Sequence, residues 1–243
     1  MSRRRATKRT ASVIPACLIG ALVTFAAPAE AAGTAVEQRP VADIRRVVMR
    51  ATGELIVRQG QRETLQVEAE PRLLPKIASE VRDGTLFLEF HGSQINTAHP
   101  LVFRLTVKQL EGLDSVASAD VRIGALRADS FLLRLTGSGE VGIETLDAAR
   151  FETELSGAGT VRVDGGRVGE QTLRLRGSGD YVAGALQSRN ARVSLDGSGD
   201  ATVRAGESLV VRIAGSGDLR YFGDPRVEQV ISGAGSVSRA DTH

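Results

Sequence analysis

The sequence predicts an all-β fold: a right-handed parallel β-solenoid of about seven short coils, preceded by a β-rich lead-in. Three observations support this prediction. A glycine phrase recurs at a nearly fixed spacing, apolar and polar residues alternate around each copy, and the repeat contains no helical segment. Repeats of this length are typical of stacked units that bury their apolar faces only against a neighbouring unit.

The recurring phrase is Gly-(Ser/Ala)-Gly plus one residue, and it occurs six times at spacings of 20, 20, 20, 18 and 18 residues. A stacked corner requires glycine because glycine accepts positive φ and lets coils pass about 4.8 Å apart. One period before the first copy, the segment 117–120 (Ala-Ser-Ala-Asp) predicts a degenerate first corner. The structural turns are expected at Gly137, Gly139, Gly157, Gly159, Gly177, Gly179, Gly197, Gly199, Gly215, Gly217, Gly233 and Gly235.

Positions at even distances from the first glycine are mostly apolar, so they share one face of a strand. Examples stand two residues before it (Leu135, Leu155, Leu175) and four residues after it (Val141, Val161, Tyr181). Odd positions are polar, and stacking would make Arg134, Glu154 and Arg174 lateral neighbours of opposite sign. Leucines at 126, 146 and 186 indicate a third short wall. A β-propeller is the alternative, but its blades are about twice as long.

The lead-in covers about residues 41–112, and the coils cover about 113–240. Alternating apolar runs separated by glycine turns predict short antiparallel or mixed strands in the lead-in. A short helix can lie between Pro71 and Val81. We expect this segment to protect the open edge of the first coil. The strand candidates are 47–49, 55–57, 65–67, 86–90 and 101–105.

Residues 1–31 have the features of a secretory signal peptide: a basic start, an apolar run, and small residues at a cleavage site. The remaining residues 32–243 hold 26 basic and 28 acidic side chains, a net charge of −2, because the leader takes 5 of 31 and 1 of 29. We therefore expect an exported bacterial protein, periplasmic, at the cell surface or secreted, with no transmembrane anchor after cleavage. A nucleic-acid partner is not expected without a basic face. The single cysteine, Cys17, lies in the leader, so disulfides are excluded from the exported part.

Several segments in a fixed order carry a family resemblance: 55–60 (LIVRQG), 81–86 (VRDGTL), the Gly-Ser-Gly-Asp coils, and 221–225 (YFGDP) before the last corner. In these segments the chain resembles the head GIN domain family of putative autotransporter adhesins. The resemblance covers nearly all of 32–243 and implies one GIN-type domain. It also implies a β-helical, exported protein of the bacterial cell envelope with an adhesion role.

Catalytic and cofactor motifs are weak in this sequence. Residues 137–142 match the Gly-x-Gly-x-x-Gly dinucleotide fingerprint, but that motif needs a following helix, and here a strand pattern follows. The histidines, His91, His99 and His243, lie outside the repeat and offer no triad. We therefore expect no enzyme and no cofactor.

Acidic residues form a column at the fourth corner position, which gives two hypotheses. The side chains can cap their own turns in solvent. Alternatively, the ladder Asp180, Asp200 and Asp218 binds Ca²⁺ or provides acid/base groups for a polysaccharide-active β-helical protein. The column comprises Asp120, Glu140, Asp180, Asp200 and Asp218, with Thr160 interrupting it.

The adjacent aromatics Tyr221 and Phe222 are the best candidate contact patch, because one of two consecutive strand residues faces outward. The predicted function is a non-enzymatic binding or structural protein of the envelope. Its partner is expected to be an envelope protein, a polysaccharide, or a second copy of the chain.

Overall fold

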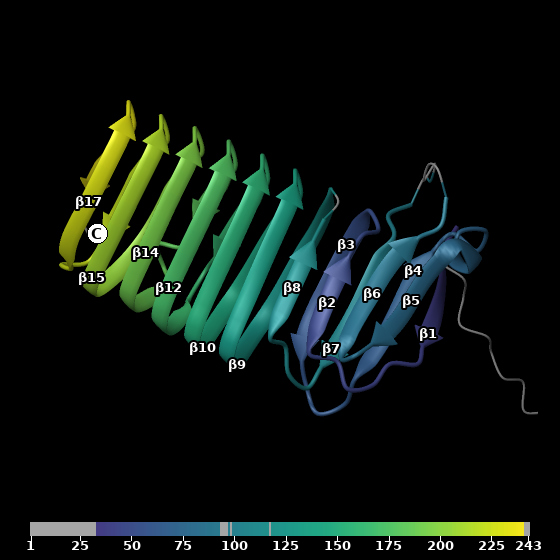
Figure 1. Cartoon of the computed structure of the whole chain (residues 1–243). Coiled ribbons are helices and arrows are strands. Elements are labelled where there is room, and N and C mark those ends of the chain that lie inside the picture. Colours follow the sequence, from purple (N-terminus) through teal and green to yellow (C-terminus); the bar gives the residue numbers. More distant parts are fainter. Residues whose placement is uncertain (1–32, 93–96, 98, 117, 241–243) are drawn as a thin grey trace, which may run out of the picture.

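The computed structural model describes residues 33–92, 97, 99–116 and 118–240, which form a β-solenoid of about six turns (Figure 1). Its eighteen strands belong to one hydrogen-bonded network, and the described residues include no α-helix. The all-β solenoid predicted from the glycine spacing is confirmed, with about six turns where about seven coils were expected. The signal peptide proposed for residues 1–31 lies outside the described residues.

Each coil runs along three walls. Wall A follows a glycine corner, wall C comes next, and wall B leads into the next corner. The corners form a row along the upper edge of the molecule in Figure 1. Wall B strands end at the first glycine of a corner: β9 (Ala119–Gly137), β10 (Glu140–Gly157), β12 (Gly166–Gly177), β14 (Gln187–Gly197), β15 (Ala201–Gly215) and β17 (Arg226–Gly233). Wall A is formed by the first residues of β9, β10 and β15, with β11 (Thr160–Val163), β13 (Asp180–Val182), β16 (Leu219–Phe222) and β18 (Val237–Arg239).

Successive coils pair in parallel and in register, so equal positions of the repeat stack on one another. Leu155 lies between Leu135 and Leu175, and all three side chains are fully buried. The register shifts between Ser188 and Asn190, where the period falls from 20 to 18 residues. Wall C is present as expected, since residues 145–148 pair with 125–128 and the leucines at 126, 146 and 186 are buried.

The lead-in extends walls A and B instead of forming a separate cap. Strands β2 and β3 form one rung beside the first coil, because β2 pairs with β8 and β3 pairs with β9 in parallel. Strands β6 and β7 form the next rung, parallel to β2 and β3. The rung that comes first in the sequence therefore lies between two later ones. The bounds are β2 (Arg46–Met49), β3 (Gly53–Gln59), β6 (Thr85–Phe90), β7 (Val102–Val107) and β8 (Gly112–Ser115).

Antiparallel strands complete the N-terminal end, which makes the lead-in mixed as expected. On wall A, β4 (Thr64–Ala69) pairs with β7, and β1 (Ala35–Arg39) pairs with β4. On wall B, β5 (Ile77–Arg82) pairs with β6. The helix allowed for between Pro71 and Val81 is a single 3₁₀ turn, η1 (Leu74–Lys76), with Pro75 inside it.

The core is built from ladders of like side chains running along the solenoid axis. Phe131 and Phe151 stack with ring centroids 5.8 Å apart and planes 8° apart. The next residue in this ladder is Gln171, followed by the small Ala191. Tyr181 projects inward from wall A and is 1% exposed, with Ala201 behind it in its own ladder. The small residues leave room for the large phenol, consistent with the close packing of protein interiors.

Candidate functional site

Each corner brings the backbone of one coil against a carbonyl oxygen of the coil before it. Gly177 has a φ of +120°, and a Cβ there would lie 2.4 Å from the carbonyl oxygen of Gly157. At Gly179 a Cβ would lie 2.3 Å from the carbonyl oxygen of Gly159. Both distances are far below a van der Waals contact. The first glycine of the phrase thus combines positive φ with close approach, whereas the second provides close approach.

The degenerate corner before β9 stacks in the same way. A Cβ on Gly139 would lie 2.2 Å from the carbonyl oxygen of Ala119. The hydroxyl groups of Ser118 and Ser138 lie 3.1 Å apart, within hydrogen-bond distance. Ala117, with which the proposed degenerate corner begins, lies outside the described residues. The stack of corners therefore continues at least one coil before the first Gly-x-Gly phrase.

The acidic column caps the backbone of the next coil instead of its own turn. Asp200 Oδ1 accepts a 2.8 Å hydrogen bond from the N–H of Asp218. Asp218 Oδ1 in turn accepts hydrogen bonds from the N–H and the hydroxyl of Ser236, each at 2.8 Å. Longer contacts of the same kind lead from the N–H of Glu140 to Asp120 (3.4 Å) and from the N–H of Asp200 to Asp180 (3.5 Å). Each of these carboxylates joins two coils.

The coils without an aspartate use the backbone for the same purpose. The N–H of Thr160 donates to the carbonyl oxygen of Gly139, and that of Asp180 donates to Gly159, both at 3.1 Å. These are the positions where the preceding coil carries Glu140 or Thr160. An aspartate side chain is long enough to reach the backbone N–H of the equivalent residue in the next coil. In coils with an aspartate, the carboxylate therefore replaces the corner glycine's carbonyl oxygen as the acceptor.

This geometry weighs against the cation hypothesis. Asp180, Asp200 and Asp218 are exposed, and one oxygen of each is engaged by a backbone N–H. Within the described part of the chain, no group of three acidic, histidine or cysteine side chains is arranged to hold a metal ion.

The two adjacent aromatics point to opposite sides of wall A. Tyr221 packs against the core and is half-buried. Phe222 lies on the outer surface, half-buried, with the Arg204 guanidinium carbon 4.9 Å from its ring centroid. The Nε of Arg204 also donates a 2.8 Å hydrogen bond to the carbonyl oxygen of Gly184. Arg204 thus holds the ring on the wall, and of the two aromatics Phe222 is the one on the outer surface.

A polar contact lies inside the solenoid, where no ligand can reach it. The Nε2 of Gln171 donates a 2.7 Å hydrogen bond to the hydroxyl oxygen of Tyr181, and both side chains are 1% exposed. Burial raises the pKa of the Tyr181 phenol above its ordinary value. The pair therefore has a structural role.

Wall B carries a row of ion pairs at the odd positions of the repeat. Arg134 lies between Asp114 at 3.5 Å and Glu154 at 2.8 Å. Arg174 lies 3.7 Å from Glu154 and also contacts Glu152. The hydrogen bond to Glu154 is the main cause that raises the pKa of Arg134. The lateral pairing of opposite charges expected from the sequence is present, although such exposed pairs contribute only a few tenths of a kcal/mol.

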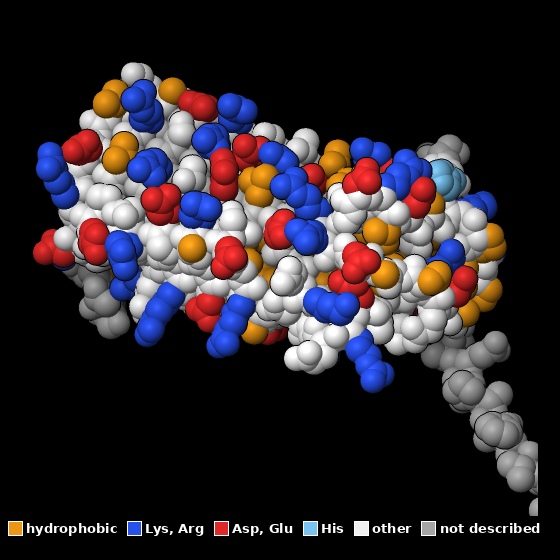
Figure 2. All heavy atoms as spheres, turned by 60° about the horizontal axis from the view of Figure 1, so that its bottom comes forward, with side chains coloured by type: hydrophobic (Ala, Val, Ile, Leu, Met, Phe, Trp, Pro, Cys, Tyr) orange, Lys and Arg blue, Asp and Glu red, His pale blue; other side chains and the backbone are white. Residues whose placement is uncertain are grey.

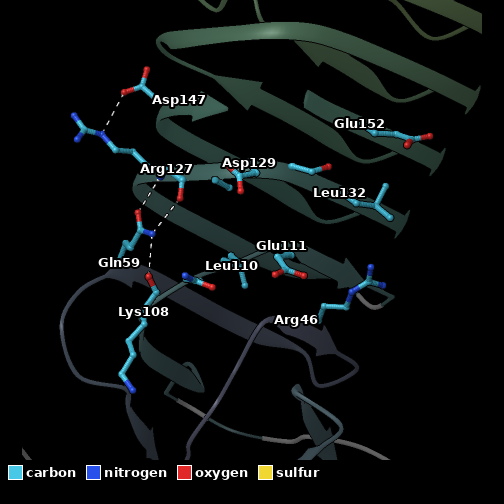
Figure 3. A pocket seen from close by; sticks show the side chains of 13 residues that line it. Arg46, Gln59, Lys108, Leu110, Glu111, Arg127, Asp129, Leu132, Asp147 and Glu152 are labelled. Atoms are coloured by element: carbon cyan, nitrogen blue, oxygen red, sulfur yellow. Dashed lines mark hydrogen bonds and ion pairs between the residues drawn. The ribbon is translucent and has the colours of Figure 1, made fainter. Parts of the chain in front are cut away.

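A depression lies in the described surface where the lead-in meets the first coil, and we call it the junction groove. Strand β7 passes to β8 through only four residues, 108–111, so this rung has no wall C. Wall C of the next coil, residues 124–130, then stands beside the short loop. The resulting groove has a volume of about 650 Å³ and is seen in Figure 3.

Gln59 holds the two sides of the junction groove together. Its Nε2 donates to the carbonyl oxygens of Lys108 (3.0 Å) and Arg127 (3.1 Å), while its Oε1 accepts from the N–H of Arg127 (2.9 Å). The Arg127 side chain reaches Asp147 at 3.6 Å, as Figure 3 shows. All the hydrogen-bonding groups of the Gln59 amide are directed at backbone, so the loop and wall C form a rigid frame.

The lining of the junction groove is mainly polar and carries charges of both signs. Its two leucines differ in exposure, since Leu110 is fully buried and Leu132 is half-buried. Charged groups of both signs surround them, which suits a ligand with donors and acceptors better than a purely anionic or apolar one. The charged lining residues are Arg46, Lys108, Glu111, Arg127, Asp129, Asp147 and Glu152.

Sequence reasoning missed the junction groove, although a sign of it exists. The coils place a wall C between walls A and B, with leucines at 126, 146 and 186, whereas only the four residues 108–111 connect β7 to β8. That missing wall C could have been noticed. The pairing of Gln59 with Arg127, 68 residues later, leaves no local pattern.

The residues that would support catalysis are not brought together. His91 follows β6, and its N–H donates to the carbonyl oxygen of Lys76, while His99 lies in the same connection before β7. Both lie in the connection between β6 and β7, and β3 separates β7 from β9, which carries Asp120. His243 lies outside the described residues. After the fingerprint-like segment 137–142, β10 continues as a strand, so the helix that would bind a pyrophosphate is missing there.

The space-filling view shows that Lys and Arg side chains alternate with Asp and Glu over the visible face (Figure 2). This face has no broad region of one sign, in keeping with the near-neutral charge of 32–243. In the part of the chain that the structure describes, no helix is long and apolar enough to cross a membrane.

Solved structures share this fold. A "putative adhesin" from Bacteroides fragilis superposes with a TM-score of 0.80 at 23% identity, covering 86% of this chain and 98% of that one. A "putative lipid binding protein" from Parabacteroides distasonis has a TM-score of 0.68 at 22% identity, covering 87% and 98%. A "putative adhesin" from the same species has a TM-score of 0.68 at 22% identity, covering 85% and 97%.

A search of curated proteins found no match to the chain. The sequence model of one family, described as "putative auto-transporter adhesin, head GIN domain", matches residues 45–225. This range includes the lead-in rungs, the junction groove and most of the coils, and it agrees with the resemblance seen in the sequence. The chain therefore belongs to the family described as "putative auto-transporter adhesin, head GIN domain".

Proposed function

We propose that this chain is a non-enzymatic, exported binding protein of adhesin type that holds a polar macromolecule of the cell envelope. The observation that carries the proposal is the junction groove, a cleft of about 650 Å³ whose lining carries charges of both signs and whose two sides are joined by Gln59. Pockets of this kind, with convergent polar groups on a preformed frame, are the usual sites of ligand binding.

The scaffold supports a binding role because it is stiff. Stacked coils are joined by parallel pairing on all three walls, by glycine corners, and by the aspartate caps. A preformed surface loses little conformational entropy on binding, which favours recognition. Phe222 on wall A offers a second, smaller contact outside the groove.

A polysaccharide-active enzyme is the rival function, and the geometry gives it less support. Acid/base catalysis needs carboxylates free to reach a substrate. Here the corner aspartates accept backbone hydrogen bonds, and their neighbours along the column lie one coil away. The family and the similar structures also favour adhesion over catalysis.

Export is part of the proposal and has its own test. If residues 1–31 are a signal peptide, bacteria that express the full chain will carry it outside the cytoplasm in a form that begins near Ala32. N-terminal sequencing of the envelope and secreted fractions measures this. Recovery of an intact leader in the cytoplasm would contradict it.

The binding test uses residues 32–243 immobilised on beads and exposed to envelope extract, with purified envelope polysaccharide and lipid vesicles as separate arms. The groove variant is Lys108→Glu with Asp129→Lys, which leaves the net charge unchanged. We expect it to lower the affinity for the retained partner at least about tenfold, or 1.4 kcal/mol. The class of partner is identified by which of the three samples, extract, polysaccharide or vesicles, the immobilised domain retains.

The matched control is Arg162→Glu with Asp164→Lys, an equivalent exchange at exposed positions around β11. It should bind like the unchanged domain. Equal losses in both variants, or none in the groove variant, would contradict a site in the junction groove. Melting temperatures of both variants check that the fold is intact.

A further inference from the structure

The last rung of the solenoid leaves apolar side chains exposed at an open edge. Among the described strands, β17 pairs only with β15, and β18 only with β16. Ile231 is 37% exposed although Ile213, one coil earlier in the same ladder, is 1% exposed, and Val230 is 60% exposed. In Figure 1, β17 is the yellow strand at one end of the molecule. Unpaired strand edges of this kind readily pair with another chain.

The opposite end of the molecule is protected. Its edge strands β1 and β5 carry ion pairs along the strand, Arg39 with Glu37 and Arg82 with Glu80. Leu73 and Ile77, which close the interior there, are each 3% exposed. Charged edges and covered interiors are the usual means by which proteins prevent edge pairing. Strand β17 also carries an ion pair, Arg226 with Glu228, so charge alone does not distinguish the two edges. The ends differ in their interiors, which are covered at the N-terminal end but leave Ile231 exposed at the C-terminal end.

We propose that the chain forms a two-fold dimer in which β17 pairs antiparallel with β17 of a second copy, with the axis passing through Gln229. The inner face of β17 then places Val227 opposite the partner's Ile231 and Gln229 opposite the partner's Gln229. An axis perpendicular to wall B keeps the inner faces on one side, so the core continues from one copy into the other. The primary amides at the axis are self-complementary, because each has a donor and an acceptor.

The side chains select this register. On the outer face, Glu228 lies opposite the partner's Val230, and Arg226 lies opposite the partner's Ser232, so no like charges meet. An axis through Glu228 would instead place two carboxylates opposite each other, which is unfavourable. An axis through Val227 would leave Ile231 beyond the paired segment. An axis through Val230 gives an overlap of the same length but places Gln229 opposite the partner's Ile231. The register through Gln229 instead places Val227 opposite the partner's Ile231 on both sides of the axis.

A closed dimer follows from the difference between the two ends. Head-to-tail pairing would build an open filament, but it needs the charged edges of β1 and β5. A two-fold contact uses the C-terminal edge twice and ends there. Counting six coil steps in each copy and one step between them, the two junction grooves lie roughly 60 Å apart. Such a dimer would bind a repetitive surface at two points and gain avidity.

The first experiment measures the mass of residues 32–243 by sedimentation equilibrium over a range of concentrations. We expect twice the monomer mass, and a rise of at least tenfold in the dissociation constant for Ile231→Lys. Val36→Lys is the matched control, since Val36 is an exposed apolar residue (58%) on the edge strand β1 of the other end. A monomer at all concentrations, an open series of oligomers, or an effect confined to Val36→Lys would overturn the proposal.

The second experiment tests the register and does not depend on weakening the edge. Residues 32–243 contain no cysteine, so a single introduced cysteine is unique. Opposed residues of an antiparallel pair lie about 4.5–5.5 Å apart, within disulfide range. Gln229→Cys should therefore give a cross-linked dimer on mild oxidation, and Val230→Cys should not. Equal cross-linking of both variants, or of neither, would overturn the register and the dimer.

Discussion

The carboxylate of Asp200 accepts a 2.8 Å hydrogen bond from the backbone N–H of Asp218, eighteen residues later in the chain. The two residues occupy the same place in adjacent coils, so their carboxylates stack and would repel each other. The hydrogen bond from the N–H offsets this repulsion, because an N–H dipole directed at a carboxylate is a favourable charge-assisted contact. The acidic column therefore acts in the stacking of coils.

Replacing this acceptor should weaken the stack. Asp200→Ala leaves the N–H of Asp218 without its side-chain acceptor, and we expect a loss of about 1 kcal/mol in the free energy of unfolding. Asp200→Asn keeps an oxygen at the same place and should lose less than half as much. Urea unfolding measures both, and Asp196→Ala, at an exposed wall B position, is the control. Equal losses for the alanine and asparagine variants would indicate a role other than this hydrogen bond.

Calcium should not stabilise the protein. A bound ion raises the melting temperature in proportion to the logarithm of its concentration once it exceeds the dissociation constant. Because Asp180, Asp200 and Asp218 each share an oxygen with a backbone N–H, we expect constant melting temperatures as Ca²⁺ is increased to millimolar levels. A rise that disappears in a variant with all three residues changed to asparagine would restore the cation hypothesis.

The second glycine of a corner should tolerate no side chain. In Gly179→Ala the new methyl would lie 2.3 Å from the carbonyl oxygen of Gly159, so the coils must move apart. We expect a loss of about 2 kcal/mol or more, the usual cost of overpacking. Gly142→Ala is the control, since no heavy atom lies within 4 Å of a Cβ there. Thermal melting of both variants measures the difference, and similar melting temperatures would contradict close stacking at the corner.

Tyr181 should make stability fall at alkaline pH. Burial raises the pKa of its phenol in the folded protein, so its contribution is fully present below about pH 10, the ordinary pKa of tyrosine. It decreases as the pH rises from there toward the folded pKa, because only the unfolded chain then ionises. Tyr181→Phe should remove this part of the alkaline loss, as measured by urea unfolding between pH 8 and pH 11. Tyr221→Phe, which leaves Tyr181 in place, should retain it.

At neutral pH the same variant should be less stable. Tyr181→Phe removes the acceptor of the Gln171 amide inside the core, and an unsatisfied buried donor costs about 1–3 kcal/mol. Adding Gln171→Leu should recover part of this loss, because it removes the donor as well. If the double variant lost more free energy of unfolding than the two single variants lose together, the pairing of these groups would be contradicted.

Local patterns in the sequence predict much of this fold. The glycine phrase marks every corner from Gly137 onward, and the even offsets identify inward side chains such as Leu155. The charge order along Arg134, Glu154 and Arg174 predicts their lateral pairing. Each of these features repeats with the coil, so a single chain shows it several times.

Features that occur once could not be predicted in this way. The sequence leaves two hypotheses for the aspartates, capping of their own turns or a role in cation binding or acid/base chemistry. It does not show that Asp200 and Asp218 accept hydrogen bonds from the backbone of the next coil. Tyr181 was placed in the core by its position, yet its partner Gln171 could be identified only from the way two ladders meet inside the solenoid.

The spacing of glycines and the alternation of apolar residues specify a stacked β-solenoid, since both are properties of one coil repeated along the chain. The order of the lead-in rungs, with β2 and β3 between β8 and the later β6 and β7, is set by contacts between distant segments. The junction groove depends on that order, because it forms only where a rung without wall C lies beside the first complete coil. Pairing across the stack, rather than any local pattern, thus creates the candidate site.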